Sequence, residues 1–539
     1  MSEAFIGVDV GTGSVRAGVF DSQGALLASA RRPIEIWHEA GGIVEQSSAN
    51  IWAAACAAIR EAVGSSARGP QAVQGLSFDA TCSLVVLDLT GAPLAAGPSG
   101  DPARNVIVWM DHRASGEADT INAEPHDVLR FVGGRISPEM QMPKLLWLAR
   151  NLPATFRDAG HFLDLTDFLT WRASGVSARS ICTLACKWTY LAHEKRWDRS
   201  FFKRIGLEAL GGANQERIGT EIVEPGSPLG TGLCEEAALA MGLTPGIPVG
   251  AGLIDAHAGA LGTMGASLGE ERVDRRRRLA LILGTSSCTM ALSDDPRFIP
   301  GVWGPYFSAL TPGQWLTEGG QSAFGAAIDH LMRFHPAFAR LSAEVGDKAF
   351  ERMEADILVR AGSLSAGARL AGDLHVLPDF LGNRSPFAEP QSRGAIIGLG
   401  LDENYDSLLA LYVATLSGLT QGIAQIVRAL ESGGYVFDML VVSGGAARSP
   451  LVCQTIADAT GIKVGIPETS EPVLLGAAML GAVAAGRHTM QSAMADMSRL
   501  AHGVLPAGGE IAALHENRRR VIELAQETER RARMIMQRH

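Results

Sequence analysis

An acidic residue, a glycine-rich turn and an arginine stand close together near the N-terminus. Asp9 is followed by Gly11-Thr12-Gly13-Ser14 and then by Arg16. A carboxylate can hold a hydrated divalent cation, the N–H groups and hydroxyls of a turn can bind phosphate oxygens, and a guanidinium can offset developing negative charge. These residue types in this order favour a site for a nucleoside triphosphate. The structural alternative is a hairpin turn that merely requires glycine.

Two further glycine-rich segments strengthen the nucleotide interpretation. Gly284-Thr285-Ser286-Ser287 follows one apolar run, and Gly444-Gly445-Ala446, with Ser449 shortly after it, follows another. A strand that leads through a glycine-rich loop into a helix N-terminus presents free N–H groups to an anion. The sequence contains no G-x-x-x-x-G-K-[ST], and position 16 is Arg rather than the last Gly of G-x-G-x-x-G. The sequence therefore predicts a different kind of phosphate site.

The elements that must position these segments form a pattern that occurs twice. Residues 4–20 read as two strands joined by the first turn, and a third strand-like run precedes a helical pattern at 48–62. A strand, a Gly-Thr-Ser turn and a second strand recur at 279–292. This weak internal repeat predicts two similar α/β domains that face each other across a cleft, with a boundary near 260–270.

Two charged segments lie outside the repeat. The basic run Arg275 to Arg278 precedes a predicted strand, and we expect a solvated turn there, with an anion site as the alternative. The C-terminal stretch 511–539 carries Val521, Leu524 and Ala525 at helical spacing. We expect a peripheral helix that packs through these three residues.

Composition and charge narrow the function classes. The 539 residues are 47% hydrophobic and 19% charged, which excludes a disordered scaffold, and the net charge of −10 gives no positive field for nucleic acid or anionic lipid. The seven cysteines include no C-x-x-C pair, and we interpret Cys182 and Cys186 as small buried hydrophobes. Without a signal-peptide pattern or an apolar run of about 18 residues, we expect a cytoplasmic protein with no nucleic-acid or membrane partner.

The three glycine-rich segments, in this order and at these separations, resemble the phosphate-1, phosphate-2 and adenosine motifs of the sugar kinase, Hsp70 and actin superfamily. The carbohydrate kinases of the FGGY family are the most similar, since further segments match their motifs, at 109–113, 144–148, 252–259 and 380–386. The resemblance covers residues 4 to about 485. It implies two actin-like (ribonuclease H-like) ATPase domains that flank a catalytic cleft, at 1–265 and 266–487, and then a helical extension at 488–539.

The same resemblance gives each candidate residue a role. Asp255 would be the catalytic base that accepts the proton of the attacking hydroxyl, and an N-capping aspartate is the structural alternative. Asp9 would hold Mg²⁺, partly through water. ATP would be bound by Thr12, Gly13, Ser14, Arg16, Gly284, Thr285, Gly444, Gly445, Ala446 and Ser449. Some relatives carry Asn where this chain has Ser449, which bears on the adenine contacts.

The sugar is predicted from segments that resemble ribulokinases more than xylulose kinases. The stretch with Asp79, Thr81 and Cys82, three residues that we expect to contact the sugar, replaces the Gln-Met-His-Gly stretch of xylulose kinases. Lys187 and Glu318, which we also expect to bind the sugar, lie in segments whose ribulokinase counterparts contact the ketose. The resemblance implies ATP-dependent phosphorylation of D-ribulose to D-ribulose 5-phosphate, in a family whose members are often homodimers. The alternatives are a kinase for L-ribulose, ribitol or xylulose, an actin- or Hsp70-like ATPase switch, and a non-catalytic sugar sensor.

Overall fold

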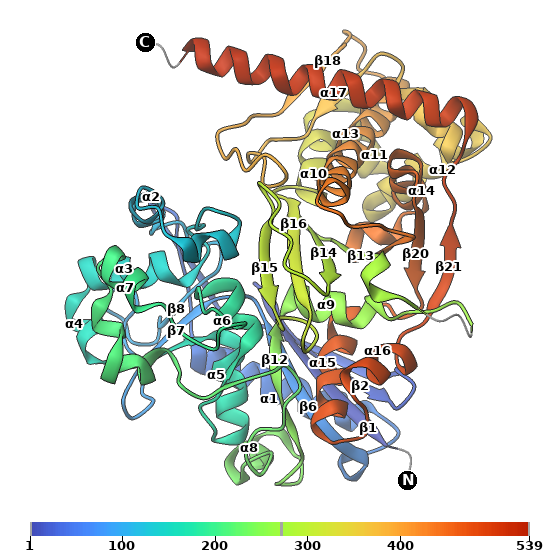
Figure 1. Cartoon of the computed structure of the whole chain (residues 1–539). Helices are drawn as coiled ribbons and strands as arrows, with labels where there is room; N and C mark the ends of the chain where they lie inside the picture. The colour runs from blue at the N-terminus through green and yellow to red at the C-terminus, as the bar shows by residue number, and fades with distance from the viewer. Residues whose placement is uncertain (1–2, 270–272, 537–539) are drawn as a thin grey trace.

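The computed structural model describes residues 3–269 and 273–536. It consists of an N-terminal half, coloured blue to green in Figure 1, and a C-terminal half, coloured mainly yellow to red, which lies above it in that view except for two orange-red helices beside the N-terminal sheet. Each half is built on a mixed sheet with helices packed against it, which confirms the predicted α/β class.

The main sheet of the N-terminal half has the strand order β12 (Val249–Ile254), β6 (Val73–Ala80), β1 (Ala4–Val10), β2 (Ser14–Asp21) and β3 (Leu26–Pro33). The central strand β1 is buried along its whole length. It pairs antiparallel with β2, so that Asp9 lies opposite Arg16, and parallel with β6. Because β12 is also parallel to β6, the carboxyl ends of three strands meet at one edge of the sheet.

The main sheet of the C-terminal half repeats this topology. Its order is β15 (Trp303–Phe307), β16 (Trp315–Gln321), β14 (Ser287–Ser293), β13 (Arg278–Leu283), β19 (Met439–Ser443), β20 (Lys463–Pro467) and β21 (Leu500–Val504). The central strand β13 pairs antiparallel with β14 and parallel with β19, as β1 does with β2 and β6. The next neighbours, β16 and β20, correspond to β3 and β12. The internal repeat predicted from the two turns is therefore confirmed.

Two helices lie between the halves. α9 (Asp255–Met264) follows β12 directly, and α15 (Pro472–Ala484) packs against α9 and against β1 and β6 of the N-terminal sheet. The backbones approach closely: a Cβ at Gly7 would lie 1.9 Å from the carbonyl oxygen of Leu474, and one at Gly476 would lie 2.0 Å from that of Ala258. Only glycine fits such contacts. α15 thus covers the N-terminal sheet although it comes late in the chain.

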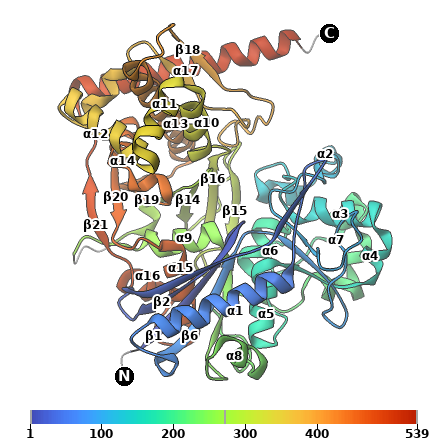
Figure 2. The ribbon, with the colours of Figure 1, turned by 180° about the vertical axis from the view of Figure 1, so that it is seen from behind.

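A second sheet and a group of short helices complete the N-terminal half. This sheet has the order β4 (Ile36–Glu39), β5 (Ile43–Gln46), β8 (Val106–Ile107), β7 (Leu84–Asp88) and β9 (Ala159–Asp164). Figure 2 shows α1 (Ser48–Ser65), close to its predicted bounds, lying along the first sheet. The remaining elements are α2 (Ser115–Asn122), α3 (Gln141–Asn151), α4 (Pro153–Asp158), α5 (Leu165–Ser174), α6 (Ile181–Lys187), α7 (Arg199–Ile205), α8 (Glu235–Met241), β10 (Arg179–Ser180) and β11 (Ile222–Val223).

Helix α13 (Tyr405–Ser432) forms the core of the C-terminal half. By length and composition it could cross a membrane, but 83% of its apolar window is buried inside the protein, so it is a core helix. Around it lie α10 (Gly325–Phe334), α11 (Pro336–Val345), α12 (Ala349–Ala361), α14 (Pro450–Thr460), β17 (His375–Leu377) and β18 (Ala395–Ile397). α16 (Met490–Asp496) instead lies beside α9 and α15.

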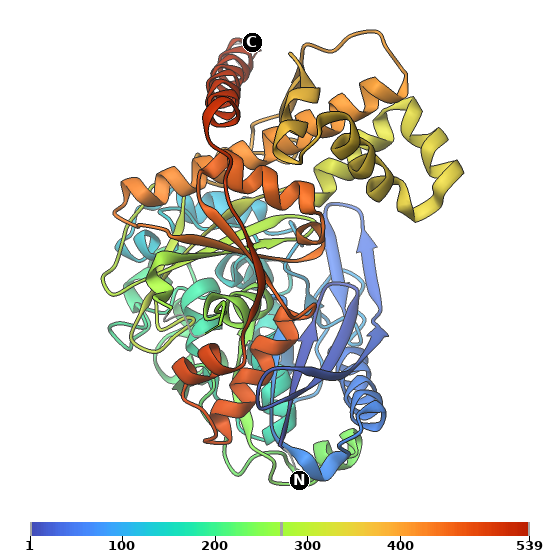
Figure 3. The ribbon, with the colours of Figure 1, turned by 90° about the vertical axis from the view of Figure 1, so that its right-hand side faces the viewer.

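The C-terminal helix is α17 (Gly509–Met536), drawn in dark red at one end of the molecule in Figure 3. Residues 537–539 of the predicted helix lie outside the described residues. Ala525 is buried as expected, but Leu524 is 63% exposed, so its predicted inward position is wrong. The buried face of α17 instead includes Ile511, Arg518, Ile522 and Gln526. The three predicted residues span only about one helical turn, and so short a pattern does not determine which side of the helix faces α13. The extension is also not wholly helical, since β21 joins the sheet edge.

The basic run at 275–278 is only partly a solvated turn. Arg276 and Arg277 are exposed, and they donate hydrogen bonds to Asp294 and Asp438 respectively. Arg278 is buried as the first residue of β13. The exposed arginines already have acidic partners, which disfavours the anion-site alternative.

Candidate active site

A cavity of about 270 Å³ lies where the two halves meet. The N-terminal half contributes Asp9, Thr12, Arg16, Thr81, Cys82, Lys187 and Asp255 to its wall, and the C-terminal half contributes Gly284, Glu318 and Arg384. These residues come from strand ends and helix termini that are far apart in the sequence. The fold thus brings the predicted base, most predicted sugar contacts and the first phosphate segment into one space.

The hairpin at the start of the chain holds Arg16 against Asp9. The guanidinium of Arg16 donates to Oδ2 of Asp9 through Nε (2.8 Å) and Nη2, and Nη1 donates to Oε2 of Glu471 (2.6 Å), just before α15. Asp9 is nearly fully buried, whereas 34% of the Arg16 side chain is exposed and the residue lines the cavity. An anion that entered here would meet a guanidinium already held in place.

Asp79 lies behind this pair rather than at the cavity wall. It is directly opposite Asp9 in the pairing of β6 with β1, and it is fully buried. No donor among the described residues reaches its carboxyl oxygens, and burial first and Asp9 second raise its pKa well above the ordinary value. The position differs from the direct sugar contact that we expected, because β6 ends one residue later and turns Thr81 and Cys82 to the cavity instead.

Asp255 has the features that a general base needs. It is the first residue of α9, after the N-cap Ile254, and its Oδ1 accepts a hydrogen bond from the backbone N–H of Ala256 (2.7 Å). Its carboxyl lines the cavity, and burial first and the charge of Asp9 second raise its pKa to about 6. A carboxyl with such a pKa is ionised at neutral pH yet accepts a proton more readily than an ordinary aspartate.

Lys187 and Glu318 reach the cavity from opposite halves. Lys187 ends α6 and Glu318 lies in β16, and both are nearly fully buried. Burial lowers the pKa of Lys187, but nearby groups, chiefly Glu318, raise it further, so the net pKa is well above the ordinary value. Oε2 of Glu318 accepts no hydrogen bond from any described residue. A buried ammonium and a buried carboxylate oxygen with spare capacity suit the hydroxyls of a polyol.

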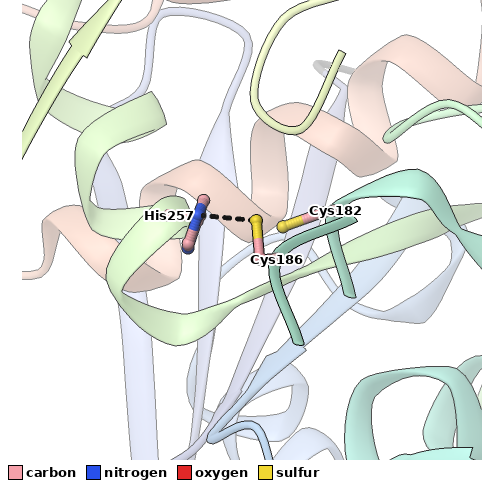
Figure 4. A group of neighbouring side chains, drawn as sticks. All are labelled: Cys182, Cys186 and His257. Carbon is pink, nitrogen blue, oxygen red and sulfur yellow. Dashed lines mark hydrogen bonds between the residues drawn. The ribbon is translucent and has the colours of Figure 1, made fainter. Parts of the chain in front are cut away.

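Cys182, Cys186 and His257 form a small group beside Glu318, since Nε2 of His257 is 4.0 Å from Oε2 of Glu318; Figure 4 shows the three side chains of the group. All three are fully buried, their sulfur and nitrogen atoms lie within 4.8 Å of one another, and Sγ of Cys186 is 3.4 Å from Nε2 of His257. Burial raises the pKa of Cys186 well above the ordinary value and lowers that of His257 to about 4. Protonated thiols pack as small hydrophobes, whereas metal binding requires thiolates. The burial of both cysteines agrees with our interpretation of the sequence.

Only some of the other residues predicted to bind phosphate line the cavity. Gly284 and Ser286 line the cavity, whereas Thr285 is not among the lining residues and its carbonyl oxygen accepts hydrogen bonds from the N–H groups of Phe324 (2.8 Å) and Ala326 (3.2 Å). In the first turn, Gly13 and Ser14 also lie outside the wall. The Ser14 hydroxyl accepts a hydrogen bond from Nε of Arg31 (3.0 Å).

The predicted adenosine segment lies beyond the cavity, in the loop after β19. Gly444 has φ +92°, and a Cβ there would lie 2.4 Å from the carbonyl oxygen of Leu283, so only glycine brings this loop to the end of β13. Gly445 and Ala446 follow in a 3₁₀ turn. The Ser449 hydroxyl caps α14 by accepting from the N–H of Val452 (3.0 Å) and donates to Oε1 of Glu354 (2.6 Å). Its proton is therefore already engaged.

Several residues that line the cavity received no role from the sequence, among them Trp109, Glu139, Trp303 and Arg384. Nε1 of Trp109 donates to Oγ1 of Thr12 (3.0 Å), which connects the turn after β1 to the segment that follows β8 of the second sheet. Trp109 and Arg384 both lie in segments that matched family motifs, so the signal was present. A matched segment does not reveal which of its side chains faces the cleft.

Comparison with known proteins agrees with this architecture. The N-terminal domain model of the FGGY family of carbohydrate kinases matches residues 4–262, and the C-terminal domain model matches residues 279–485. An FGGY carbohydrate kinase domain-containing protein of Homo sapiens is 48% identical over 514 residues, covering 93% of this chain and 92% of its own. A D-ribulokinase of Saccharomyces cerevisiae is 38% identical over 511 residues, covering 89% and 72%.

Solved structures show the same fold. A xylulose kinase from Brucella ovis superposes with a TM-score of 0.81 over 98% of this chain and 99% of its own, at 22% identity. Because domain models of one family match nearly the whole chain and both halves share its topology, the chain belongs to the FGGY family of carbohydrate kinases and is a sugar kinase with two α/β domains.

Proposed function

We propose that this kinase transfers the γ-phosphoryl group of ATP to O5 of D-ribulose, giving D-ribulose 5-phosphate and ADP. The observation that carries the proposal is the single cavity that holds a base-like Asp255 together with the buried Lys187 and Glu318. The choice of D-ribulose is supported by the 38% identity to the yeast D-ribulokinase, and bacterial ribulokinases are 27–28% identical. FGGY kinases use ATP, so the nucleotide follows from the family.

In the proposed step, the O5 oxygen of the sugar forms a bond to the γ-phosphorus while the bond from that phosphorus to the β–γ bridging oxygen breaks. The O5 proton passes to the carboxylate of Asp255, and ADP leaves with the bridging oxygen. Lys187 and Glu318 hold the other hydroxyls of the sugar. Arg16 and the turns at Thr12 and Gly284 face the phosphates. Closure of the two halves over the substrates would exclude water from the cavity and so prevent wasteful hydrolysis of ATP.

We also propose that Asp9 holds Mg²⁺. The residues fit a divalent cation, because the negative charges of Asp9 and Asp255 lie near each other and near the buried carboxyl of Asp79, which accepts no hydrogen bond from a described residue, and hard cations prefer oxygen ligands. When bound, Mg²⁺ would neutralise charge on the ATP phosphates. Arg16 already offsets part of the charge of Asp9, so the cation and the guanidinium would share this carboxylate.

The proposal retains the domain division 1–265, 266–487 and 488–539, with the nucleotide bound mainly by the second domain through Gly444, Gly445, Ala446 and Ser449. It also retains a cytoplasmic location and a homodimer. Size-exclusion chromatography with light scattering tests the dimer directly.

ADP release from Mg-ATP across a panel of sugars tests the function. The panel contains D- and L-ribulose, D- and L-xylulose, ribitol, L-arabinitol and glycerol, with a blank that lacks sugar. We expect the highest kcat/KM with D-ribulose. Preference for another pentulose or pentitol would replace the substrate but keep the reaction, and ADP release that no sugar raises above the blank would contradict the proposal and favour the ATPase-switch alternative.

A further inference from the structure

Arg384 brings a cation from the C-terminal half to the Lys187 side of the cavity. It lies in the loop between β17 and β18 and lines the same cavity as Lys187 and Glu318. Its guanidinium carbon is 5.3 Å from the centroid of the Trp303 ring, and Nζ of Lys187 is also 5.3 Å from that ring. The indole therefore contacts one cation from each half of the molecule.

Most of the hydrogen-bonding capacity of Arg384 is unused. Among residues 3–269 and 273–536, its one hydrogen bond runs from Nη2 to Oε1 of Glu139 over 3.4 Å. Both side chains are largely buried, with 13% and 18% exposed, and Glu139 belongs to the opposite half. A guanidinium carries five N–H donors in a rigid fork. A buried cation with unengaged donors at a cavity wall is suited to the hydroxyls of a bound sugar.

The loop that carries Arg384 is closed at Glu389. The backbone N–H of Asn383 donates to the carbonyl oxygen of Glu389 (2.9 Å), and the N–H of Ser392 donates to the same oxygen (3.1 Å). The residue just before Arg384 is thus tied to Glu389, so the position of Glu389 sets where the guanidinium emerges.

The C-terminal helix α17 holds the same residue from outside. Nε of Arg530 (2.9 Å) and Nη2 of Arg533 (2.8 Å) donate to the carboxylate of Glu389. The carboxylate of Glu529 accepts a hydrogen bond from the backbone N–H of Arg393 (3.2 Å), at the far end of the loop. The helix therefore contacts the loop at two residues, Glu389 and Arg393.

α17 is itself fixed to the core. The side-chain amides of Gln526 and of Gln425 in α13 donate to each other's oxygens over 3.1 and 2.8 Å, and both side chains are buried. The C-terminal family model ends at residue 485, before α17 begins. This support for the loop is therefore a feature outside the matched family domains.

We propose that Arg384 is a specificity-determining residue that binds hydroxyls of the sugar, and that α17 positions it through Glu389. This inference rests on the proposed function in one respect: D-ribulose is the sugar that we expect Arg384 to bind. The sugar panel identifies the preferred sugar, and all comparisons below use that sugar, so failure of the D-ribulose assignment leaves the role of Arg384 testable.

Steady-state kinetics of the full-length kinase test the first part. Arg384→Gln should raise the KM for the preferred sugar about tenfold or more and narrow the ratio of kcat/KM between that sugar and the others, while the KM for ATP stays within about twofold. The sugar KM of Arg384→Lys should fall between those of the wild type and Arg384→Gln, because lysine keeps the positive charge but lacks the planar set of N–H donors of the guanidinium. Calorimetric titration of each variant with the sugar alone gives the same comparison without turnover. An unchanged sugar KM, affinity and selectivity in Arg384→Gln would overturn the assignment.

Glu389→Gln tests the second part, since Glu389 belongs to the loop and its carboxylate contacts α17, but it is not among the residues that line the cavity. It should raise the sugar KM about threefold and shift selectivity in the same direction as Arg384→Gln. Glu527→Gln is the matched control, because among the described residues Glu527 pairs with Arg531 alone, along the exposed side of α17. A lower melting temperature in Glu389→Gln with no change in sugar KM would show that α17 only stabilises the fold, and would overturn the positioning role.

Discussion

Replacement of Asp255 by Asn separates catalysis from stability with one change. Asn has nearly the same shape, and its amide oxygen can still accept the hydrogen bond from the N–H of Ala256. It cannot take up the proton of the attacking hydroxyl. Because a positioned general base contributes about 10²- to 10⁴-fold to the rate, kcat should fall by that factor, which corresponds to about 3–5 kcal/mol in the barrier.

The same variant should be more stable than the wild type at pH 8. The pKa of Asp255 is raised from 3.8 to about 6 in the folded protein, so the folded state binds this proton more tightly than the unfolded chain does. Stability is therefore lost as pH rises from about 4 to 6, and the loss is complete above pH 6. Two pKa units correspond to about 3 kcal/mol, and water in the cavity reduces the effect, so we expect a gain of about 1–2 kcal/mol in the variant.

Single-turnover kinetics, ATP binding by calorimetry and urea unfolding measure these effects. We expect lost turnover, unchanged ATP affinity and a higher urea midpoint in Asp255→Asn. Near-normal turnover would remove Asp255 from the role of base. A lower urea midpoint would show that the carboxylate stabilises the fold. It would refute the reasoning that burial makes the ionised form of Asp255 unfavourable in the folded protein.

Three further predictions address the pH profile, the sugar contacts and the packing of α15. Since Asp255 acts as a carboxylate with a pKa of about 6, kcat/KM for the sugar should fall about tenfold per pH unit below pH 6, and a flat profile there would contradict the assignment. Lys187→Ala and Glu318→Ala should each raise the sugar KM about tenfold or more, and a change confined to the ATP KM would place them at the nucleotide instead. The Cβ of Gly476→Ala would lie 2.0 Å from a backbone carbonyl oxygen, so this variant should be less stable in urea unfolding by about 3 kcal/mol or more. The control Gly116→Ala, whose Cβ would meet open space, should change stability by less than about 1 kcal/mol. Equal urea midpoints for the two variants would refute the close packing of α15 against α9.

Several features follow from local sequence alone. The turns at Gly11–Gly13 and Gly284 are specified by glycine and hydroxyl residues between apolar strands, so the two hairpins, the internal repeat and the α/β class were predictable. The helix at α1 was predictable for the same reason, since its apolar residues recur at helical spacing. Family motifs then pointed to Asp255, Lys187 and Glu318 as candidates.

Only the tertiary structure decided which side chains share the cavity. Asp79 and Thr81 would lie on the same face of a continuing strand, yet Asp79 is buried opposite Asp9 and Thr81 lines the cavity, because β6 ends at Ala80 between them. Arg384 reaches the cavity through a loop held by α17, more than a hundred residues later in the chain. Sequence periodicity reports which face of an element is apolar, but pairing between distant elements sets burial, charge and pKa, and those decide which polar residues meet a substrate.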